Sequence, residues 1–273
     1  MKSPNTHKIF IYTALACEAK PFIEHYKLKK DLDVHAFAVY LNNDICLTVT
    51  GIGKSAMAAA VAYTQARYNS TDHPVLLNCG IAGHQYHALG ELFIIDKITD
   101  LDSQKNYYPA LITTAPCRRA SLQTVSKPQL QYPATELCDM EASAFYETAV
   151  RFSSSELILC LKVISDNQDS SIETVDAKQV TVFIAAQLLI IEDLLLKISD
   201  LAATITPPEP QLLNELLQRY HFTAYQRQQL KSQLSRWEVI TNQQALLIDD
   251  TNILCGKDVL RWLEAHLNTI IYN

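Results

Sequence analysis

Residues 157–164 read Leu-Ile-Leu-Cys-Leu-Lys-Val-Ile, and residues 74–79 read Pro-Val-Leu-Leu-Asn-Cys. Both are short and almost continuously apolar, which is typical of strands that are buried on both faces of a sheet. The run 157–164 lies between two segments with helical periodicity, Thr135–Phe152 and Glu173–Ile198. This alternation predicts a largely parallel sheet with helices on both faces, and such sheets bind their ligands beyond the carboxyl ends of the strands.

The N-terminal part of the chain alternates in the same way. A turn is indicated at Asn42-Asn43, because asparagine tolerates the backbone conformations of tight turns. The predicted elements are the strand Lys8–Ala14, the hairpin strands His35–Leu41 and Asp44–Thr50, the helix Lys54–Tyr68 and the strand Glu91–Ile98. We therefore predict an α/β fold, a three-layer αβα sandwich with a central mixed sheet.

A break in composition follows at residues 204–210, which read Thr-Ile-Thr-Pro-Pro-Glu-Pro. Prolines at this density end the preceding helix and form a stiff linker. We predict a main domain over residues 1–203, a linker over 204–210 and a small helical extension over 211–273. The extension carries three amphipathic helical faces and no spacing typical of a catalytic or metal site, so we expect it to serve packing or assembly.

The bulk composition argues against several classes of protein. A formal charge of −6 gives no general attraction to nucleic acid or to an anionic membrane. The longest apolar run, Val180–Leu196, is interrupted by Gln187, Glu192 and Asp193, which predicts a buried helix and not a membrane span. The first residues contain no long apolar stretch of the kind found in signal peptides. We expect a cytoplasmic protein that binds neither nucleic acid nor membrane.

The cysteines and histidines give no metal site. The 7 cysteines are scattered singly with no Cys-x-x-Cys pair, which is typical of reduced thiols in the cytoplasm. His84 and His87 lie in a predicted loop, but no acidic or sulfur ligands stand nearby at the usual spacings, so we expect a surface pair. Neither a metal nor an organic cofactor is expected.

The segment Gly51-Ile52-Gly53-Lys54-Ser55-Ala56 follows a predicted strand and opens a predicted helix. A P-loop would need glycine at position 48, where this chain has Thr48. A dinucleotide site would need an acidic residue at the end of the next strand, where Asn78 and Cys79 stand instead. The two glycines are therefore interpreted as a turn that allows close approach of the backbone to some other ligand.

Two acidic segments have an ordinary structural explanation when each is taken alone. Asp139-Met140-Glu141-Ala142 opens a predicted helix, where acidic residues stabilise the helix dipole. Ser165-Asp166 follows the apolar run 157–164 and could be a polar turn. Asp166 nevertheless stands at the carboxyl end of a strand, where ligands bind in folds of this class.

Taken together and in order, five segments resemble the signatures of the nucleoside phosphorylase superfamily, nearest to methylthioadenosine/S-adenosylhomocysteine nucleosidases. The resemblance covers roughly residues 8–198. The segments are Ala14-Leu15-Ala16-Cys17-Glu18-Ala19, Gly51-Ile52-Gly53-Lys54, Asn78-Cys79-Gly80-Ile81-Ala82-Gly83, Asp139-Met140-Glu141-Ala142 and Ile164-Ser165-Asp166.

The resemblance implies cleavage of the N-glycosidic bond of a purine-type nucleoside. It assigns Glu18 to activation of the attacking water and Asp166 to protonation of the departing base. Glu141 would accept hydrogen bonds from the ribose hydroxyls, and Met140 would pack against the sugar. The remaining residues of the implied substrate site are Ile52, Gly80, Ile81, Ala82 and Ser165.

The nucleophile and the degree of activity stay open at this point. The phosphorylases of this superfamily hold phosphate with a Gly-Asp-Pro-x-Arg loop and a second arginine, whereas this chain has Cys17-Glu18-Ala19-Lys20 and no arginine beside Gly80. Water is therefore the expected nucleophile, and phosphorolysis is the alternative. Because the base-binding stretch Asp100–Glu136 is shorter than in the nucleosidases, a catalytically weak nucleoside-binding or regulatory module is a further alternative. The resemblance also implies a homo-oligomer, with a dimer favoured.

Overall fold

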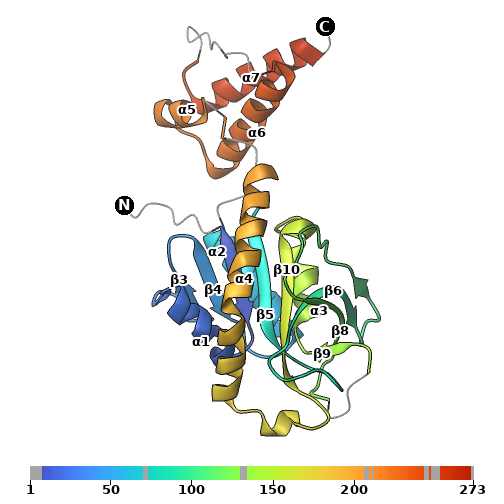
Figure 1. Ribbon diagram of the computed structural model, residues 1–273. Helices are drawn as coiled ribbons and strands as arrows, with labels where there is room; N and C mark the ends of the chain where they lie inside the picture. The colour runs from blue at the N-terminus through green and yellow to red at the C-terminus, as the bar shows by residue number, and fades with distance from the viewer. Residues whose placement is uncertain are drawn as a thin grey trace. The chain divides into compact units, whose positions relative to one another are not determined.

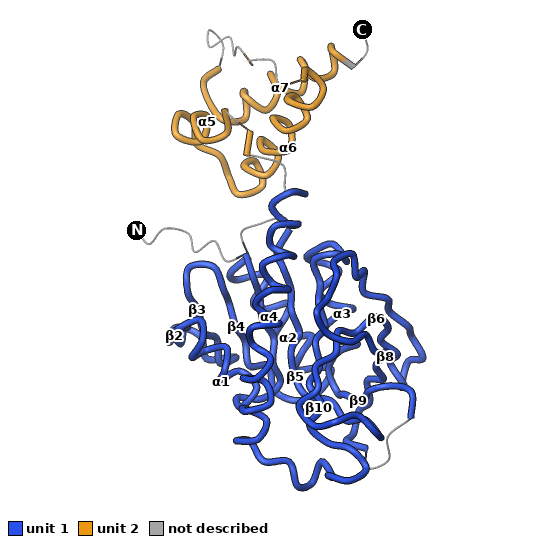
Figure 2. Tube along the Cα trace, viewed as in Figure 1, with its two compact units in different colours: residues 1–206 blue, residues 207–273 orange. Residues whose placement is uncertain are grey.

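The computed structural model describes residues 8–69, 73–129, 134–205, 209–210, 212–242, 246 and 253–271. The chain divides into two compact units, unit 1 (Met1–Thr206) and unit 2 (Pro207–Asn273), which Figure 2 shows in different colours. The last helix of unit 1 runs to Ile205, two residues into the stretch predicted as a linker. Residues 206–208 and 211 lie outside the described residues.

Unit 1 alternates strands and helices along most of its length (Figure 1). The order is β1 (Ile9–Thr13), α1 (Ala16–His25), β2 (Lys29–Lys30), β3 (Ala38–Leu41), β4 (Ile45–Val49), α2 (Lys54–Tyr68), β5 (Val75–Gly83), β6 (Leu92–Asp100), β7 (Asn106–Tyr107), β8 (Arg118–Thr124), β9 (Leu137–Asp139), α3 (Ala142–Ala149), β10 (Ile158–Asp166) and α4 (Ala177–Ile205). The predicted α/β architecture with a central mixed sheet is confirmed.

The sheet is parallel at its centre, where β1 lies between β4 and β5, and β5 also pairs in parallel with β10. From β10 the sheet continues through β6, β8 and β9, and β9 pairs again with β5. This half of the sheet therefore closes on itself. The hairpin β3–β4 and the short strand β2 extend the other edge. Because β1, β5 and β10 are parallel neighbours, their carboxyl ends lie at the same edge of the sheet.

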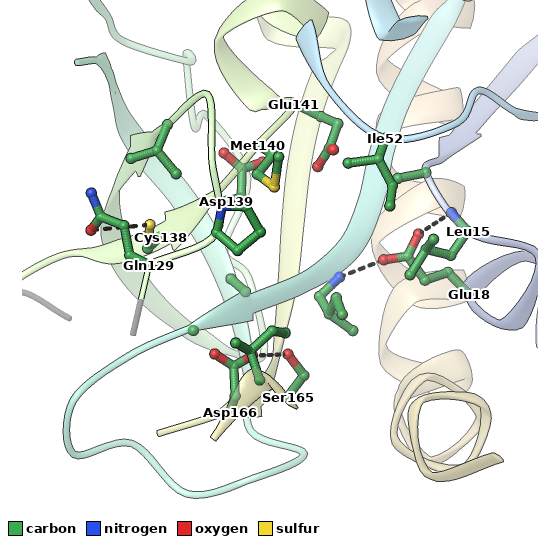
Figure 3. Close-up of a pocket in the computed structure, with 17 residues that line it drawn as sticks. Leu15, Glu18, Ile52, Gln129, Cys138, Asp139, Met140, Glu141, Ser165 and Asp166 are labelled. Carbon is green, nitrogen blue, oxygen red and sulfur yellow. Dashed lines mark hydrogen bonds between the residues drawn. The ribbon is translucent and has the colours of Figure 1, made fainter. Parts of the chain in front are cut away.

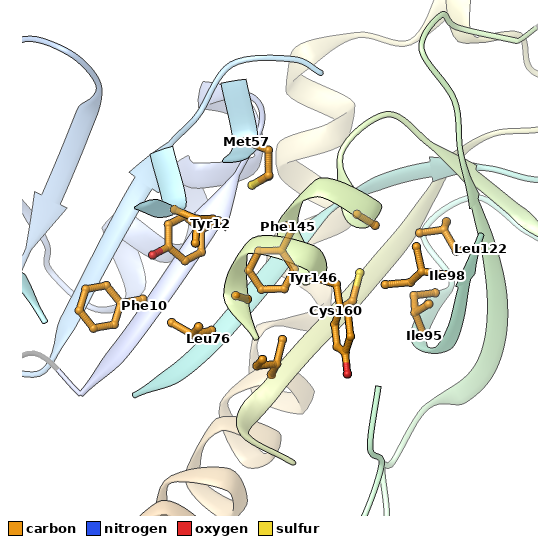
Figure 4. Packing of buried hydrophobic residues seen from close by; sticks show 14 of the residues in the cluster. Phe10, Tyr12, Met57, Leu76, Ile95, Ile98, Leu122, Phe145, Tyr146 and Cys160 are labelled. Carbon is orange, nitrogen blue, oxygen red and sulfur yellow. The ribbon is translucent and has the colours of Figure 1, made fainter. Parts of the chain in front are cut away.

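Two hydrophobic clusters cover the two faces of the sheet. Side chains alternate across a strand, so Phe10 and Tyr12 of β1 point to the face covered by α2 and α3, while Ile11 points to the face covered by α1 and α4. Figure 4 shows Tyr12 beside Phe145 of α3, with ring centroids 5.8 Å apart. Each such fully buried side chain stabilises the fold by about 1.5–3 kcal/mol.

Helix α1, which the sequence patterns did not predict, carries a proline in its interior. Pro21 has no N–H to donate to the carbonyl of Cys17, one turn earlier. Instead, the hydroxyl of Thr181 on α4 donates to the Cys17 carbonyl oxygen at 3.0 Å. The contact ties the start of α4 to the first turn of α1, which carries Glu18.

The predicted helix Thr135–Phe152 is wrong at both ends. Residues 137–139 form the strand β9, and α3 runs only from Ala142 to Ala149. The N–H of Ala142 is satisfied by the Asp139 carboxylate at 2.8 Å, so the acidic segment precedes the helix and caps it. Met140 and Glu141 therefore stand between a strand and a helix, at the edge of the sheet where ligands bind.

Unit 2 contains α5 (Leu213–Arg219), α6 (Ala224–Ile240) and α7 (Gly256–Ile271). The faces predicted to be apolar pack on one another, and Leu213, Leu230, Leu234, Val259 and Leu263 belong to one buried cluster. Thr223 begins α6 with a capping box, since its hydroxyl accepts from the Gln226 N–H and the Gln226 side chain accepts from the Thr223 N–H. The unit thus has a small core of its own.

Candidate functional site

A cavity of about 190 Å³ opens at the carboxyl ends of the parallel strands (Figure 3). Eight of the nine predicted site residues line it: Glu18, Ile52, Ile81, Ala82, Met140, Glu141, Ser165 and Asp166. Figure 3 shows Glu18, Glu141 and Asp166 on three different sides of this cavity. Three carboxylates far apart in the sequence are therefore brought together, and each of them is buried.

Glu18 is held by the backbone on two sides. Its Oε2 accepts the N–H of Leu15 at 2.8 Å, and its Oε1 accepts the N–H of Ile81 at 2.9 Å. Leu15 is the N-cap residue of α1 and Glu18 is the third residue of that helix. A side chain at the third position commonly accepts the N–H of the N-cap residue, so the start of the helix fixes the carboxylate. Burial raises the pKa of Glu18 above the ordinary value, and the two N–H donors and the charge of Lys162 oppose that rise. A carboxylate with a raised pKa is a better proton acceptor.

Gly80, the ninth predicted residue, is not part of the cavity wall but lies directly behind Glu18. A Cβ placed on Gly80 would meet Glu18 Oε1 at 2.9 Å, closer than real Cβ contacts come. Glycine is therefore required here by the close approach of the carboxylate to the backbone of β5. The segment predicted to end at Cys79 in fact continues as a strand to Gly83, so Gly80, Ile81 and Ala82 present backbone to the site.

Glu141 is anchored by the glycine turn before α2. The N–H of Gly53 donates to Glu141 Oε1 at 2.7 Å, and both Gly51 and Gly53 have positive φ angles, of 85° and 99°. These angles favour glycine and let the turn bring its backbone up to the carboxylate. Within the described residues Oε2 of Glu141 has no hydrogen-bond partner, and Figure 3 shows the carboxylate directed into the cavity. Glu141 can therefore accept hydrogen bonds from a ligand.

The pKa of Glu141 lies near neutral pH. Burial, followed by the charge of Asp139, raises its pKa to about 7, while Lys162 and the Gly53 N–H act in the opposite direction. A carboxylate in this range changes charge within the physiological pH range, which is a common property of functional sites.

A buried ion pair lies beside the cavity. Lys162 Nζ is 2.8 Å from Asp139 Oδ2, and both side chains are at most 1% exposed. Burial alone lowers the pKa of Lys162, but neighbouring anionic groups, Asp139 first, more than offset this effect and raise it. Thr124 also donates to Asp139 Oδ1 at 2.8 Å, and the Ala142 N–H donates to Oδ2. The charge of Lys162 opposes the rise in the pKa of Glu18 and of Glu141, whereas the charge of Asp139 adds to the rise for Glu141.

Asp166 ends β10 and is 2% exposed. The hydroxyl of Ser165 donates to Asp166 Oδ1. The Asp166 carbonyl accepts the N–H of His84 at 3.1 Å, which fixes the backbone between the ends of β5 and β10. Asp166 is thus held at the floor of the cavity shown in Figure 3, opposite Glu141.

Sequence reasoning named no residue of one wall of the cavity, and it missed the ion pair. This wall is formed chiefly by Val125, Pro128, Gln129 and Cys138, after β8 and on β9, and the first three lie in the stretch 100–136 that the resemblance makes base-binding. Burial raises the pKa of the Cys138 thiol to about 12, so this thiol is neutral and is a weak hydrogen-bond donor. The side chain Oε1 of Gln129 lies 3.8 Å from Cys138 Sγ. The only sequence signal for the ion pair was Lys162, a single charge within an otherwise apolar strand.

The prediction that His84 and His87 lie on the surface is wrong for His84, whose exposed fraction is 4%. Its ring stacks on that of His87 with centroids 3.9 Å apart, and its Nδ1 accepts the N–H groups of Tyr86 and His87. Burial lowers the pKa of both histidines. Among the described residues, no group of three or more His, Cys, Asp or Glu side chains could hold a metal ion.

No protein-family model and no curated protein matches the sequence. Solved structures do match the fold. A 5′-methylthioadenosine nucleosidase of Arabidopsis thaliana superposes with a TM-score of 0.57 at 16% identity, covering 71% of this chain and 96% of that one. An MTAN of Chlamydia trachomatis bound to MTA gives 0.53 at 17% identity, covering 70% and 100%. The 5′-methylthioadenosine/S-adenosylhomocysteine nucleosidase of Neisseria meningitidis, in complex with methylthio-immucillin-A, gives 0.52 at 16% identity, covering 67% and 97%. The fold expected from the resemblance is confirmed.

Proposed function

We propose that the cavity of unit 1 cleaves the N-glycosidic bond of a purine-type nucleoside, with water as the nucleophile. The observation that carries the proposal is the convergence of Glu18, Glu141 and Asp166 on one cavity at the carboxyl ends of parallel strands. The proposal is supported by the fold, which this chain shares with MTA/SAH nucleosidases.

The sugar is held by Glu141 and Met140. Oε2 of Glu141 accepts hydrogen bonds from the ribose hydroxyls, while Oε1 stays on the Gly53 N–H. A hydrogen bond to an ionised carboxylate is about twice as strong as one between neutral groups, so this contact fixes the orientation of the sugar. Met140 offers a flexible apolar side chain to the face of the ring.

The attacking water is activated by Glu18. The water oxygen forms a bond to C1′ of the sugar while one of its protons passes to the Glu18 carboxylate. Because Glu18 is held by two backbone N–H groups, it needs no rearrangement to receive this proton. Ile81 and Ala82, next to Gly80 on the same strand, border the space in which the water would sit.

The leaving base is protonated by Asp166. As the bond between C1′ and the base nitrogen breaks, its electron pair moves into the purine ring, and the Asp166 proton passes to N7. The base departs neutral and the sugar develops oxocarbenium character, as in acid-assisted glycoside hydrolysis. Solvent then returns a proton to Asp166 and removes one from Glu18, which completes the cycle.

Water is favoured over phosphate by the charge of the cavity. None of the described residues that line it is a lysine or an arginine. The nearby Lys162 is engaged by Asp139 at 2.8 Å. A phosphate dianion among these carboxylates would need positively charged donors that the described wall does not offer.

The experiment is release of free base from a nucleoside panel, in buffer with and without inorganic phosphate. The panel includes 5′-methylthioadenosine, because the Chlamydia trachomatis neighbour was solved bound to MTA. We expect base release without phosphate and no acceleration when phosphate is added. Release that depends on phosphate would establish phosphorolysis instead, and binding of nucleosides without any release would establish a binding module.

A further inference from the structure

Asp100, the last residue of β6, is a buried carboxylate that the proposed mechanism does not use. It is not among the described residues that line the cavity. Its Oδ1 accepts the N–H groups of Asp102 and Ser103, at 3.1 and 2.8 Å, and so closes the turn that follows the strand. Its Oδ2 instead accepts from two other elements, from Lys54 Nζ at 2.9 Å and from Ser143 Oγ at 2.6 Å. One carboxylate therefore joins the end of a strand to two helices.

The two side-chain donors stand next to the hydrogen bond that anchors Glu141. Lys54 is the first residue of α2 and follows Gly53, whose N–H donates to Glu141 Oε1 at 2.7 Å. Ser143 is the second residue of α3 and stands two positions after Glu141. Oδ2 of Asp100 thus makes a second link between the same two segments that the Gly53–Glu141 hydrogen bond joins.

The Gly53–Glu141 hydrogen bond needs this support, because neither of its sides is held firmly by local structure. Gly51 and Gly53 both have positive φ angles, and glycine loses more backbone freedom on folding than any other residue. Glu141 is the N-cap residue of α3 but its side chain does not cap the helix, so the helix start does not fix this carboxylate as it fixes Glu18. A functional side chain has to be held within about 0.5 Å of its productive position. The link through Asp100 supplies that constraint.

Burial decides which part of this network carries weight. Lys54 Nζ also lies 2.5 Å from Asp102 Oδ2, but the side chain of Asp102 is 57% exposed, and exposed ion pairs contribute little. The side chain of Asp100 is 8% exposed, and a buried carboxylate that loses its partners is left with an uncompensated charge. Burial by itself raises the pKa of Asp100, but its hydrogen bonds, that from Ser143 first, outweigh this effect and lower the pKa. Asp100 therefore stays ionised over the pH range in which Glu141 titrates.

We propose that Asp100 is a positioning residue for Glu141. Through Lys54 and Ser143 it holds the start of α2 against the start of α3. The Gly53 N–H then stays on Glu141 Oε1, and Glu141 Oε2 stays directed into the cavity. The inference rests on the proposed function for what Glu141 binds, the hydroxyls of a ribose, whereas the link itself is a property of the ligand-free fold.

NMR can follow the hydrogen bond between Gly53 and Glu141 without any ligand. The amide signal of Gly53 moves when Glu141 ionises, because its N–H donates to that carboxylate, and the amplitude of this movement falls if the contact is lost. Since the chain has only 6 glycines, labelling with nitrogen-15 glycine gives few signals. In the wild type we expect a full titration of Gly53 with its midpoint at the pKa of Glu141, about 7. The other charged groups that act on Glu141 are Asp139, Lys162 and Glu18, and the variants that test the link alter none of them.

Asp100→Ala removes the acceptor of both donors, so the Gly53 titration should lose most of its amplitude. The pKa of Glu141 should rise by about 1 unit, because the Gly53 N–H lowers that pKa and a hydrogen bond to a charged group is worth about this much. Roughly a tenth of Glu141 is then ionised at pH 7 in place of a half. Binding of a purine C-nucleoside, which has no scissile carbon–nitrogen bond, should weaken about fivefold at that pH.

The loss of a charge at position 100 predicts the opposite shift. Removing an anion favours the ionised form of a neighbouring carboxylate and lowers the pKa of Glu141. A Gly53 titration of full amplitude in Asp100→Ala, with its midpoint lowered or unchanged, would therefore overturn the proposal.

Ser143→Ala removes one donor without any change of charge, and alanine favours a helix. The Gly53 titration should lose part of its amplitude, and less than in Asp100→Ala, because Lys54 still binds Asp100. If Asp100→Ala does not fold, this variant decides, and an unchanged titration in it excludes the positioning role.

The matched control lies on the same helix as Lys54. Thr64 of α2 is buried, and its hydroxyl lies 2.9 Å from the hydroxyl of Tyr12. Thr64→Val removes this contact and should lower the melting temperature while leaving the Gly53 titration unchanged. A loss of amplitude equal to that in Asp100→Ala would show that any damage to the core releases Gly53, which contradicts a specific role for Asp100.

The two proposals fail separately. Release of base by the wild type tests the proposed function, whereas the Gly53 titration needs no substrate. A wild type that cleaves nucleosides, with an unchanged Gly53 titration in Asp100→Ala, refutes the positioning role alone. A wild type that cleaves none, with the titration lost in the variant, refutes the proposed function and establishes that Asp100 positions Glu141.

Discussion

Lowering the pH from 8 to 6 should weaken the binding of a purine ribonucleoside about tenfold, through protonation of Glu141. The pKa of Glu141 is raised to about 7, mainly by burial and by the charge of Asp139. Roughly 90% of the carboxylate is then ionised at pH 8 and roughly 10% at pH 6. Only the ionised form accepts hydrogen bonds at both oxygens, and the apparent dissociation constant rises as the competent fraction falls. A tenfold change in that fraction gives the tenfold change in affinity.

The assay is isothermal titration calorimetry with a purine C-nucleoside, which lacks the scissile carbon–nitrogen bond and so reports binding alone. Glu141→Gln should bind more weakly and should lose the pH dependence. The matched control is Glu147→Gln on α3, the helix that Glu141 precedes. Its partner Lys105 lowers the pKa of Glu147, so this group stays ionised at pH 6 and the variant should keep the tenfold change. Equal affinity of the wild type at pH 6 and pH 8, or an unchanged dependence in Glu141→Gln, would refute the reasoning.

Three further substitutions test the supports of the site. Glu18→Gln should lower turnover about 10²-fold or more with little change in binding of the C-nucleoside, because the amide cannot accept the water proton; unchanged turnover would remove this role. Gly80→Ala, whose Cβ would meet Glu18 Oε1 at 2.9 Å, should displace the carboxylate and lower turnover about 10-fold to 100-fold, measured as base release beside a thermal unfolding curve that detects loss of the fold. Lys162→Met leaves the buried carboxylate of Asp139 unpaired and should lower the free energy of unfolding in urea by about 3–5 kcal/mol. The same change at the exposed Lys105 should cost less than about 1 kcal/mol, and equal losses at the two positions would show that the buried pair is not special.

Local patterns were sufficient for the elements that are long or buried on both faces. The helix Lys54–Tyr68 was predicted with its observed bounds, and the apolar run 157–164 is β10 with a shift of one or two residues at each end. Short elements were missed because their formation depends on partners. Strand β9 has three residues, and it exists because Leu137 and Cys138 pair with β8. No periodicity can be detected over such a length.

The residues of the site fall into the same two groups, those that a local sequence pattern identifies and those whose place depends on tertiary partners. Residues carried by recognisable segments, such as Glu18 and Glu141, could be named from the sequence, although their roles stay predictions. The partnership of Lys162 with Asp139 could not be named, because it depends on how β9 and β10 are arranged around the closed half of the sheet. The wall formed by Gln129 could not be named either, since it lies in an irregular segment where side-chain direction follows tertiary packing and not local pattern.

The most direct test of the account compares the wild type with Asp166→Asn in phosphate-free buffer, under single-turnover conditions with a purine ribonucleoside. We predict that the wild type releases free base and that the variant does so about 10²-fold or more slowly, because general acid catalysis is worth that much. The affinity of the variant for the C-nucleoside should stay within about threefold of the wild-type value, because the amide preserves the size of the carboxyl group. Equal rates of base release from the two proteins, or no release from the wild type with any member of the nucleoside panel, would contradict the claim that this cavity cleaves the N-glycosidic bond.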